Sequence, residues 1–216
     1  MPLTMPEELL LLMLDDQSGR LIDRSMPAGD YALIGAVLAE LTLAGRIDSD
    51  PQRLFVVNPA PTNDPVLDAA LAQIAASPTQ QDSRYWIETL AAGAATIREQ
   101  LFARLVAHGV LRSEESRFLW VFPERRYPAV SGKEEREVKA RLLGVIFNDE
   151  IPEPRDALLI GISRAANLFS LILSSEQLDS AQKRIDQVAD LEELNRSLAA
   201  AVQEILAQIA RYAFLA

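Results

Sequence analysis

Few residues of this 216-residue chain have the types and spacing that catalysis requires. The chain has one histidine, His108, and no cysteine, so thiolate nucleophiles, disulfides and cysteine-ligated zinc are excluded. A serine nucleophile would have a single candidate base. His108 precedes Gly109 at the expected end of a helix, where an imidazole interacts favourably with the helix C-terminus. We therefore interpret His108 as a helix-end residue and not as a catalytic or metal-binding one.

The patterns that resemble catalytic or ligand-binding motifs are isolated. Ser180 and Lys183 match S-x-x-K, but the S-D-N and K-T-G partners are absent. No two glycines are closer than six residues apart, so G-x-G-x-x-G and phosphate-binding loops are excluded. Asp15 and Asp16 lack the further oxygen ligands of an EF-hand loop. We expect no metal and no cofactor, and we predict a non-enzymatic protein; an enzyme would need carboxylates that only folding brings together.

Aromatic and basic residues are instead concentrated in RFLWVFPERRYP, residues 117–128. The whole chain has a net charge of −10, whereas residues 111–141 hold eight basic and six acidic groups. Aromatic side chains beside arginines suit an anionic membrane interface, where each basic residue contributes about 1 kcal/mol. The alternative is that Trp120 and Phe122 face the core or a second copy of the chain, while the arginines form a solvated rim.

Hydrophobic periodicity predicts helices over most of the chain. Capping boxes start two of them, at Thr4 and at Ser131, and Asp64-Pro65 starts another. Glycines at 45 and 109 are placed to end helices. The predicted helices are 5–15, 30–44, 64–76, 84–91, 94–108, 133–147, 156–173, 175–190 and 191–214. We predict a mostly α fold, a compact helical bundle with short β-hairpins, forming one domain over residues 1–216.

A repeat accounts for the two predicted hairpins. AGRIDSDPQRLFVVNP (44–59) aligns without gaps with HGVLRSEESRFLWVFP (108–123). Each copy reads as the end of a helix, a glycine, a short strand, a polar turn and a second strand, as in the wing of a winged helix. The alignment predicts that residues 117–122 form a second strand. A winged-helix regulator is disfavoured, because a chain of net charge −10 repels nucleic acid.

The sequence also limits where the protein is expected to act. The N-terminus has no basic region before its short apolar run, so we expect no signal peptide. Residues 157–173 are apolar but contain Arg164 and Asn167, and a spanning helix needs about 20 apolar residues. We expect a core helix there and a cytoplasmic protein. The abundance of alanine and leucine and the scarcity of lysine indicate a bacterial source.

The chain resembles the Golgi phosphoprotein 3 family and its bacterial relatives. The residues that carry the resemblance are LTMPEELLLLMLDDQSGRL (3–21), LAELTLAGRI (38–47), APTNDPVLDAAL (60–71), WIETL (86–90), REQLFARLVAHGVL (98–111), FLWVFPERRYP (118–128) and ALLIGISRAANLF (157–169). The resemblance implies a helical domain with a hydrophobic β-hairpin, without catalysis. Family members bind phosphatidylinositol 4-phosphate at the Golgi and retain glycosyltransferases by their cytosolic tails. The family hairpin serves membrane contact and self-association, and it corresponds here to residues 111–128.

The resemblance transfers only part of the family's lipid pocket. The tryptophan of that pocket falls near Ser25 and its first arginine at Ile34. The two further arginines fall at Ala95 and Arg98, so one of four residues is retained. A single arginine is a poor phosphate clamp. We therefore expect the scaffold and the hairpin to persist without the specific pocket.

Two functions remain open from the sequence. In the first, the protein docks peripherally on the inner face of a membrane. Arg98, Arg125 and Arg126 would meet anionic phospholipid head groups, and the hairpin contact would come from Phe118, Trp120 and Phe122. In the second, the same hairpin forms a homo-oligomer that never meets lipid. Neither function involves nucleic acid.

Overall fold

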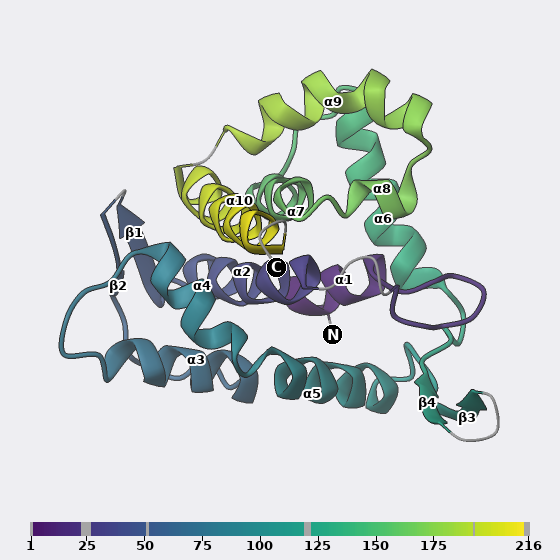
Figure 1. Ribbon diagram of the computed structural model, residues 1–216, viewed down its shortest axis with the longest axis horizontal. Coiled ribbons are helices and arrows are strands. Elements are labelled where there is room, and N and C mark those ends of the chain that lie inside the picture. The colour runs from purple at the N-terminus through teal and green to yellow at the C-terminus, as the bar shows by residue number, and fades with distance from the viewer. Residues whose placement is uncertain (1, 23–26, 51, 119–121, 192, 214–216) are drawn as a thin grey trace.

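A computed structural model describes residues 2–22, 27–50, 52–118, 122–191 and 193–213. Over these residues the chain forms ten helices and two β-hairpins (Figure 1). The helices are α1 (Met5–Leu12), α2 (Ala28–Leu43), α3 (Pro65–Ala75), α4 (Ser83–Ala91), α5 (Ala94–Ala107), α6 (Lys133–Phe147), α7 (Pro154–Ala165), α8 (Phe169–Ile172), α9 (Ser175–Ala189) and α10 (Glu193–Ala213). The strands are β1 (Ile47–Asp50), β2 (Arg53–Val56), β3 (Glu114–Phe118) and β4 (Phe122–Arg126). The predicted mostly α fold with short hairpins is confirmed.

Helix α2 forms the centre of the bundle. Its residues from Ala32 to Ala39 are all buried, as expected of a helix that is apolar on every face. It contacts α1, α3, α4, α5, α7 and α10. In Figure 1, α3, α4 and α5 lie on one side of α1 and α2, and the helices from α6 to α10 lie on the other. The core therefore runs through both layers around α2.

The predicted helix starts are confirmed at α1 and α3. Thr4 and Glu7 form the capping box of α1. The Asp64 carboxylate accepts hydrogen bonds from the amides of Val66 and Leu67 at the start of α3, with Pro65 in the first turn. The predicted box at Ser131 is wrong. Helix α6 begins after Gly132, whose φ of +63° places the N-cap in the left-handed region, and the Ser131 hydroxyl accepts from the amide of Lys133 over 3.2 Å instead of acting as the N-cap of a box.

The predicted helix 156–173 is also wrong as one element. Helix α7 ends at Ala165, and α8 starts at Phe169. Between them Asn167 has a φ of +56°, which interrupts the right-handed helix. Asparagine tolerates this conformation better than most residues do. Apolar periodicity does not report backbone conformation, so it does not identify Asn167 as the point where the helix ends.

The repeat predicts two hairpins correctly, but it misplaces the strands of the second. In the first hairpin, β1 begins at Ile47 and β2 at Arg53, as the alignment expects. In the second, β3 ends at Phe118 and β4 begins at Phe122, so residues 117–122 are not one strand. Leu111, aligned with Ile47, forms a separate bridge with Ala129. Strand β3 therefore begins three residues later than the repeat alignment expects, and β4 begins five residues later.

Candidate functional site

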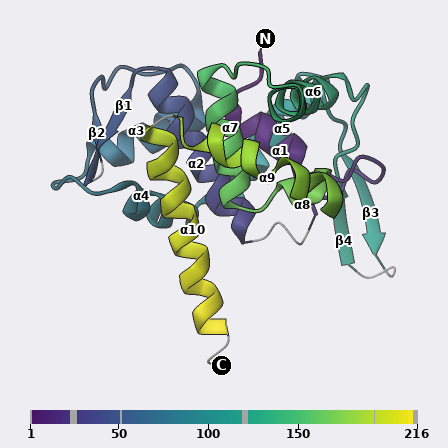
Figure 2. The same cartoon turned by 90° about the horizontal axis from the view of Figure 1, so that it is seen from above.

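The hairpin of β3 and β4 is joined to the body by a short ladder of backbone contacts. Arg112 N donates to Pro128 O over 3.0 Å, and Val130 N donates to Val110 O over 3.0 Å. Leu111, which is buried, forms the bridge with Ala129 between these two bonds. The base of the hairpin is thus part of the folded core, whereas Figure 2 shows both strands extending past the neighbouring helices.

A turn far away in sequence also holds the hairpin base. Tyr127 N donates to Gly19 O over 2.7 Å, and the Tyr127 ring stacks on Phe102 of α5 at a centroid distance of 4.1 Å. Gly19 has a φ of +63°, and an added Cβ would lie 2.3 Å from Pro128 N. Only glycine fits this close approach. Gly19 and Tyr127 were not identified from the sequence, because their contact joins segments more than a hundred residues apart.

The structure places the predicted hairpin residues around the turn. Phe118 and Phe122 are Cα partners at the last pair of the antiparallel register. Trp120 lies between them, outside the described residues. Arg125 is the Cα partner of Glu115, and Arg126 that of Glu114. The described strands therefore hold Phe118, Phe122, Arg125 and Arg126 in one hairpin, and the role of these residues in a contact stays a prediction.

Arg98 lies apart from this hairpin. It sits nine residues before the end of α5, which is about 13 Å along a helix axis. Its guanidinium forms an ion pair with Asp30 at the start of α2, and both side chains are mostly buried. Burial raises the pKa of Asp30, while the Arg98 charge opposes that rise. Of the other positions of the family pocket, Ile34 is buried and Ala95 is exposed, and neither carries a charge. Ser25 is outside the described residues.

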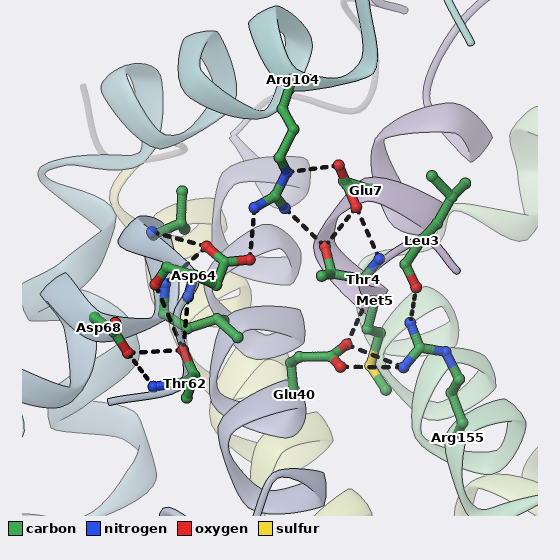
Figure 3. A network of polar contacts seen from close by, with 12 residues as sticks. Leu3, Thr4, Met5, Glu7, Glu40, Thr62, Asp64, Asp68, Arg104 and Arg155 are labelled. Atoms are coloured by element: carbon green, nitrogen blue, oxygen red, sulfur yellow. Dashed lines mark hydrogen bonds and ion pairs between the residues drawn. The ribbon is translucent and has the colours of Figure 1, made fainter. Parts of the chain in front are cut away.

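A polar network beneath α1 was not predicted (Figure 3). Glu7 is 2% exposed and accepts a hydrogen bond from Arg104 Nε over 2.7 Å. The same guanidinium contacts the Asp64 carboxylate and, over 3.0 Å, Thr4 Oγ1. One arginine of α5 thereby joins the caps of α1 and α3. The signal in the sequence was a pair of glutamates, Glu7 and Glu8, inside an otherwise apolar helix.

A second part of the network surrounds Glu8, which is 4% exposed. Arg141 of α6 and Arg155 of α7 each donate to its carboxylate over 3.1 Å. Arg141 also pairs with Asp156, and Arg155 pairs with Glu40 over 3.0 Å. Burial raises the pKa of Glu8, and the two guanidinium groups counteract it. Each of these carboxylates forms an ion pair with an arginine of another helix. The network therefore links helices, as buried ion pairs with a structural role do.

A cleft of about 360 Å³ lies between α4 and α10. The Ser83 and Ser197 hydroxyls lie 2.8 Å apart within it, and Arg84 at its rim pairs with Glu88 and Glu204. No histidine lines it, because His108 caps the end of α5 and is exposed. The cleft therefore offers a serine hydroxyl no base, and none of the predicted site residues contributes to it.

The described residues contain no cluster of acidic or histidine side chains able to hold a metal ion. Among the same residues, no helix has the length and apolar character needed to cross a membrane.

Comparison with known proteins agrees with this picture. The family model described as Golgi phosphoprotein 3 (GPP34) matches residues 5–209. The chain is also similar to vacuolar protein sorting-associated protein 74 from Eremothecium gossypii. The two are 27% identical over 249 aligned residues, which cover 98% of this chain and 70% of that relative.

Proposed function

Because this chain belongs to the Golgi phosphoprotein 3 family, whose members are peripheral Golgi proteins that bind phosphatidylinositol 4-phosphate, we propose that it is a non-enzymatic adaptor that docks on anionic membranes. The contact is made by the hairpin of β3 and β4. The protein acts from the cytoplasm on the inner face of the membrane, where anionic lipids give a negative surface potential.

One observation carries the proposal: the hairpin base is held by the core while the strands β3 and β4 extend away from it. The stack of Phe102 on Tyr127 and the bond from Tyr127 to Gly19 support the base. The strands beyond it extend past the body in Figure 2. A held base and projecting strands are what insertion of a small apolar tip into a bilayer interface requires. They leave the rest of an acidic protein at a distance from the lipid charge.

The residue types at the tip suit the interface. Phe118, Trp120 and Phe122 supply aromatic rings, which favour the level of the lipid head groups. Arg125 and Arg126 follow at the edge of the same hairpin and add about 1 kcal/mol each next to anionic lipid. This arrangement responds to the charge of the surface and not to one head group.

The proposal does not include the family's phosphatidylinositol 4-phosphate clamp. Arg98 is the retained member, and in the structure it pairs with Asp30. A guanidinium already bound to a carboxylate is a weak phosphate ligand, since the phosphate must compete for it. Arg98 therefore contributes at most a secondary contact to a head group.

Flotation with vesicles tests the proposal. Wild-type protein, Trp120→Asp and the control Val57→Asp are mixed with neutral, anionic, and phosphatidylinositol 4-phosphate vesicles at low and physiological salt. Val57 is 52% exposed and follows the other hairpin, so it matches the polarity change away from the proposed tip. Wild type and the control should float with anionic vesicles and be released by salt, and Trp120→Asp should not float. Flotation of Trp120→Asp equal to that of wild type, or none by wild type, would refute the docking.

The strand edges favour a second candidate. Each described sheet has two strands, so the outer edges of β3 and β4 pair with no further described strand. Such edges can pair with another chain. A self-associating module would form a homo-oligomer through residues 111–128 without lipid. Sedimentation velocity separates the candidates: an oligomer lost in Trp120→Asp, together with no flotation, would favour the module.

A further inference from the structure

The turn that follows α1, residues 15–20, joins the hairpin base to α6. Gly19 near its end accepts the hydrogen bond from Tyr127 N, and Asp16 near its start contacts Lys139 of α6. Two backbone hydrogen bonds of 2.8 Å each close the turn. In Figure 1 the turn lies between α6 and the strands β3 and β4. A movement of Asp16 relative to α6 therefore changes the support of the hairpin base.

The contact with α6 is a cluster of Asp16, Glu135 and Lys139, the Asp16 cluster, in which two carboxyl groups contact one ammonium group. Lys139 Nζ donates to the two Asp16 carboxylate oxygens over 2.7 and 2.8 Å, and to Glu135 Oε1 over 2.5 Å. The Glu135 and Lys139 side chains are mostly buried, whereas Asp16 is exposed. The turn adds two charges of opposite sign, Asp15 and Arg20. Two negative charges thus face one ammonium group, and one added proton balances them.

Glu135 is the residue of the cluster that holds this proton. Burial raises the pKa of Glu135 above its ordinary value of 4.5, a hydrogen bond with Asp16 raises it further, and Lys139 opposes the rise. Burial also acts on Asp16, but hydrogen bonds with Glu135 and Lys139 lower its pKa below 3.8. Burial acts against the Lys139 charge, but its bonds to the two carboxylates raise its pKa above 10.5. Above pH 4.5, therefore, Glu135 is the group that titrates.

The charged groups on the other elements packed against α6 meet a different part of this helix. Helix α6 packs against α1, α7 and α9. Glu8 of α1 and Asp156 of α7 both pair with Arg141, and Arg184 of α9 donates to Val145 O. These contacts lie towards the end of α6. The protonation of Glu135 therefore depends on the turn and on Lys139.

We propose that the Asp16 cluster is a pH-dependent switch that controls how firmly the hairpin base is held. While Glu135 is protonated, its hydrogen bond to Asp16 holds the turn against α6. Once Glu135 ionises, the two carboxylates repel each other, the turn separates from α6, and the bond from Tyr127 to Gly19 weakens. The held state binds more protons between pH 4.5 and the raised pKa of Glu135, so its advantage is complete below 4.5 and is lost as pH rises through that pKa.

Hydrogen exchange at the Tyr127 amide tests the inference, because this amide donates the bond to Gly19. NMR measures the protection factor, which corrects for the direct effect of pH on exchange, from pH 4.5 to neutral pH. The test variant is Glu135→Gln, whose amide is neutral at every pH and can still donate to Asp16. The measurement uses no lipid, so its outcome is independent of the proposed docking.

Two controls separate the switch from general effects of pH. Glu137→Gln changes a glutamate of the same helix that is 63% exposed and whose carboxylate lies 3.6 Å from Lys133 Nζ. The Val130 amide, which donates to Val110 O, reports on a bond at the hairpin base that does not involve the turn.

We expect the protection of Tyr127 in wild type and Glu137→Gln to fall at least about threefold as pH rises through the folded pKa of Glu135. In Glu135→Gln the protection should stay high over the whole range, and Val130 should change little in all three proteins. Constant protection of Tyr127 in wild type would overturn the inference. So would the wild-type slope in Glu135→Gln, or a parallel fall at Val130.

Discussion

At the residue scale, the position of the hairpin depends on a glycine outside it. The Gly19 carbonyl oxygen accepts a hydrogen bond from the Tyr127 amide, and Gly19 lies against Pro128 with no room for a methyl group. We expect Gly19→Ala to lower the free energy of unfolding by more than about 2 kcal/mol, from the left-handed backbone and the clash together. Urea unfolding measures this.

Gly45→Ala is the matched control. Gly45 has nearly the same φ, +64°, but an added Cβ would meet nothing within 4 Å. Gly45→Ala should therefore lower the free energy of unfolding by about 1 kcal/mol, from the backbone alone. Equal losses at the two positions would show that the contact with the hairpin base contributes nothing.

The arginine that joins α1, α3 and α5 gives a second prediction. Arg104→Ala leaves Glu7 buried without a guanidinium and weakens the cap at Asp64. Breaking a buried pair from one side costs about 3 kcal/mol, because the remaining charge is uncompensated. Arg53→Ala, which removes an exposed pair with Asp50, should cost under about 1 kcal/mol. Thermal and urea unfolding of both variants would contradict the prediction if the losses were alike.

At the element scale, helix types and most helix ends could be predicted from the sequence. Capping residues at Thr4 and Asp64 and apolar periodicity act locally, so a single sequence contains them. The breaks depend on backbone conformations that several residues could adopt. Asn167 interrupts a continuous apolar run, and Gly132 replaces the expected cap at Ser131. These were predicted wrongly because the local pattern favoured the regular helix.

The candidate site was predicted only in part, for a related reason. The hairpin residues are contiguous, so their composition revealed them. The displacement of β3 and β4 from the repeat register, and the support from Gly19, depend on contacts between distant segments. The buried arginine network is equally non-local, since Glu8 meets Arg141 and Arg155 from helices far along the chain.

The contact between α2 and α5 predicts a pH dependence. Burial raises the pKa of Asp30 above its ordinary value of 3.8, with Arg98 opposing. At pH values between 3.8 and the raised folded pKa, the native state binds more protons than the unfolded state. Ionisation of Asp30 therefore lowers the free energy of unfolding as pH rises through this range. Relative to wild type, Asp30→Asn should become more stable as pH rises from 3.8 through the raised folded pKa of Asp30. Urea unfolding at several pH values measures the difference.

Asp50 supplies a control of opposite sign. The hydrogen bond from Arg53 lowers the pKa of Asp50, so its contribution is present above 3.8 and is lost as pH falls through the lower folded value. Asp50→Asn should therefore lose stability relative to wild type as pH rises. A common trend in both variants would show that the slope belongs to the whole chain and not to these two contacts.

At the scale of the whole molecule, an acidic protein can bind an anionic surface only where its basic residues are concentrated at the point of contact. The net charge of −10 opposes approach to an anionic surface, and the charge of the hairpin acts only within about a Debye length. The position of a cation should therefore matter more than the total. Two variants with the same net charge separate these effects, because each arginine-to-glutamate change lowers it from −10 to −12.

Arg125→Glu places the change in β4, and Arg53→Glu places it in β2 of the other hairpin. We expect Arg125→Glu to weaken binding to anionic vesicles about tenfold or more, since a reversed charge at the surface costs roughly 1–2 kcal/mol. Arg53→Glu should bind within about twofold of wild type at physiological salt. Vesicle titration with matched melting curves provides the measurement. Equal weakening would mean that total charge controls the encounter and that the hairpin is not the point of contact.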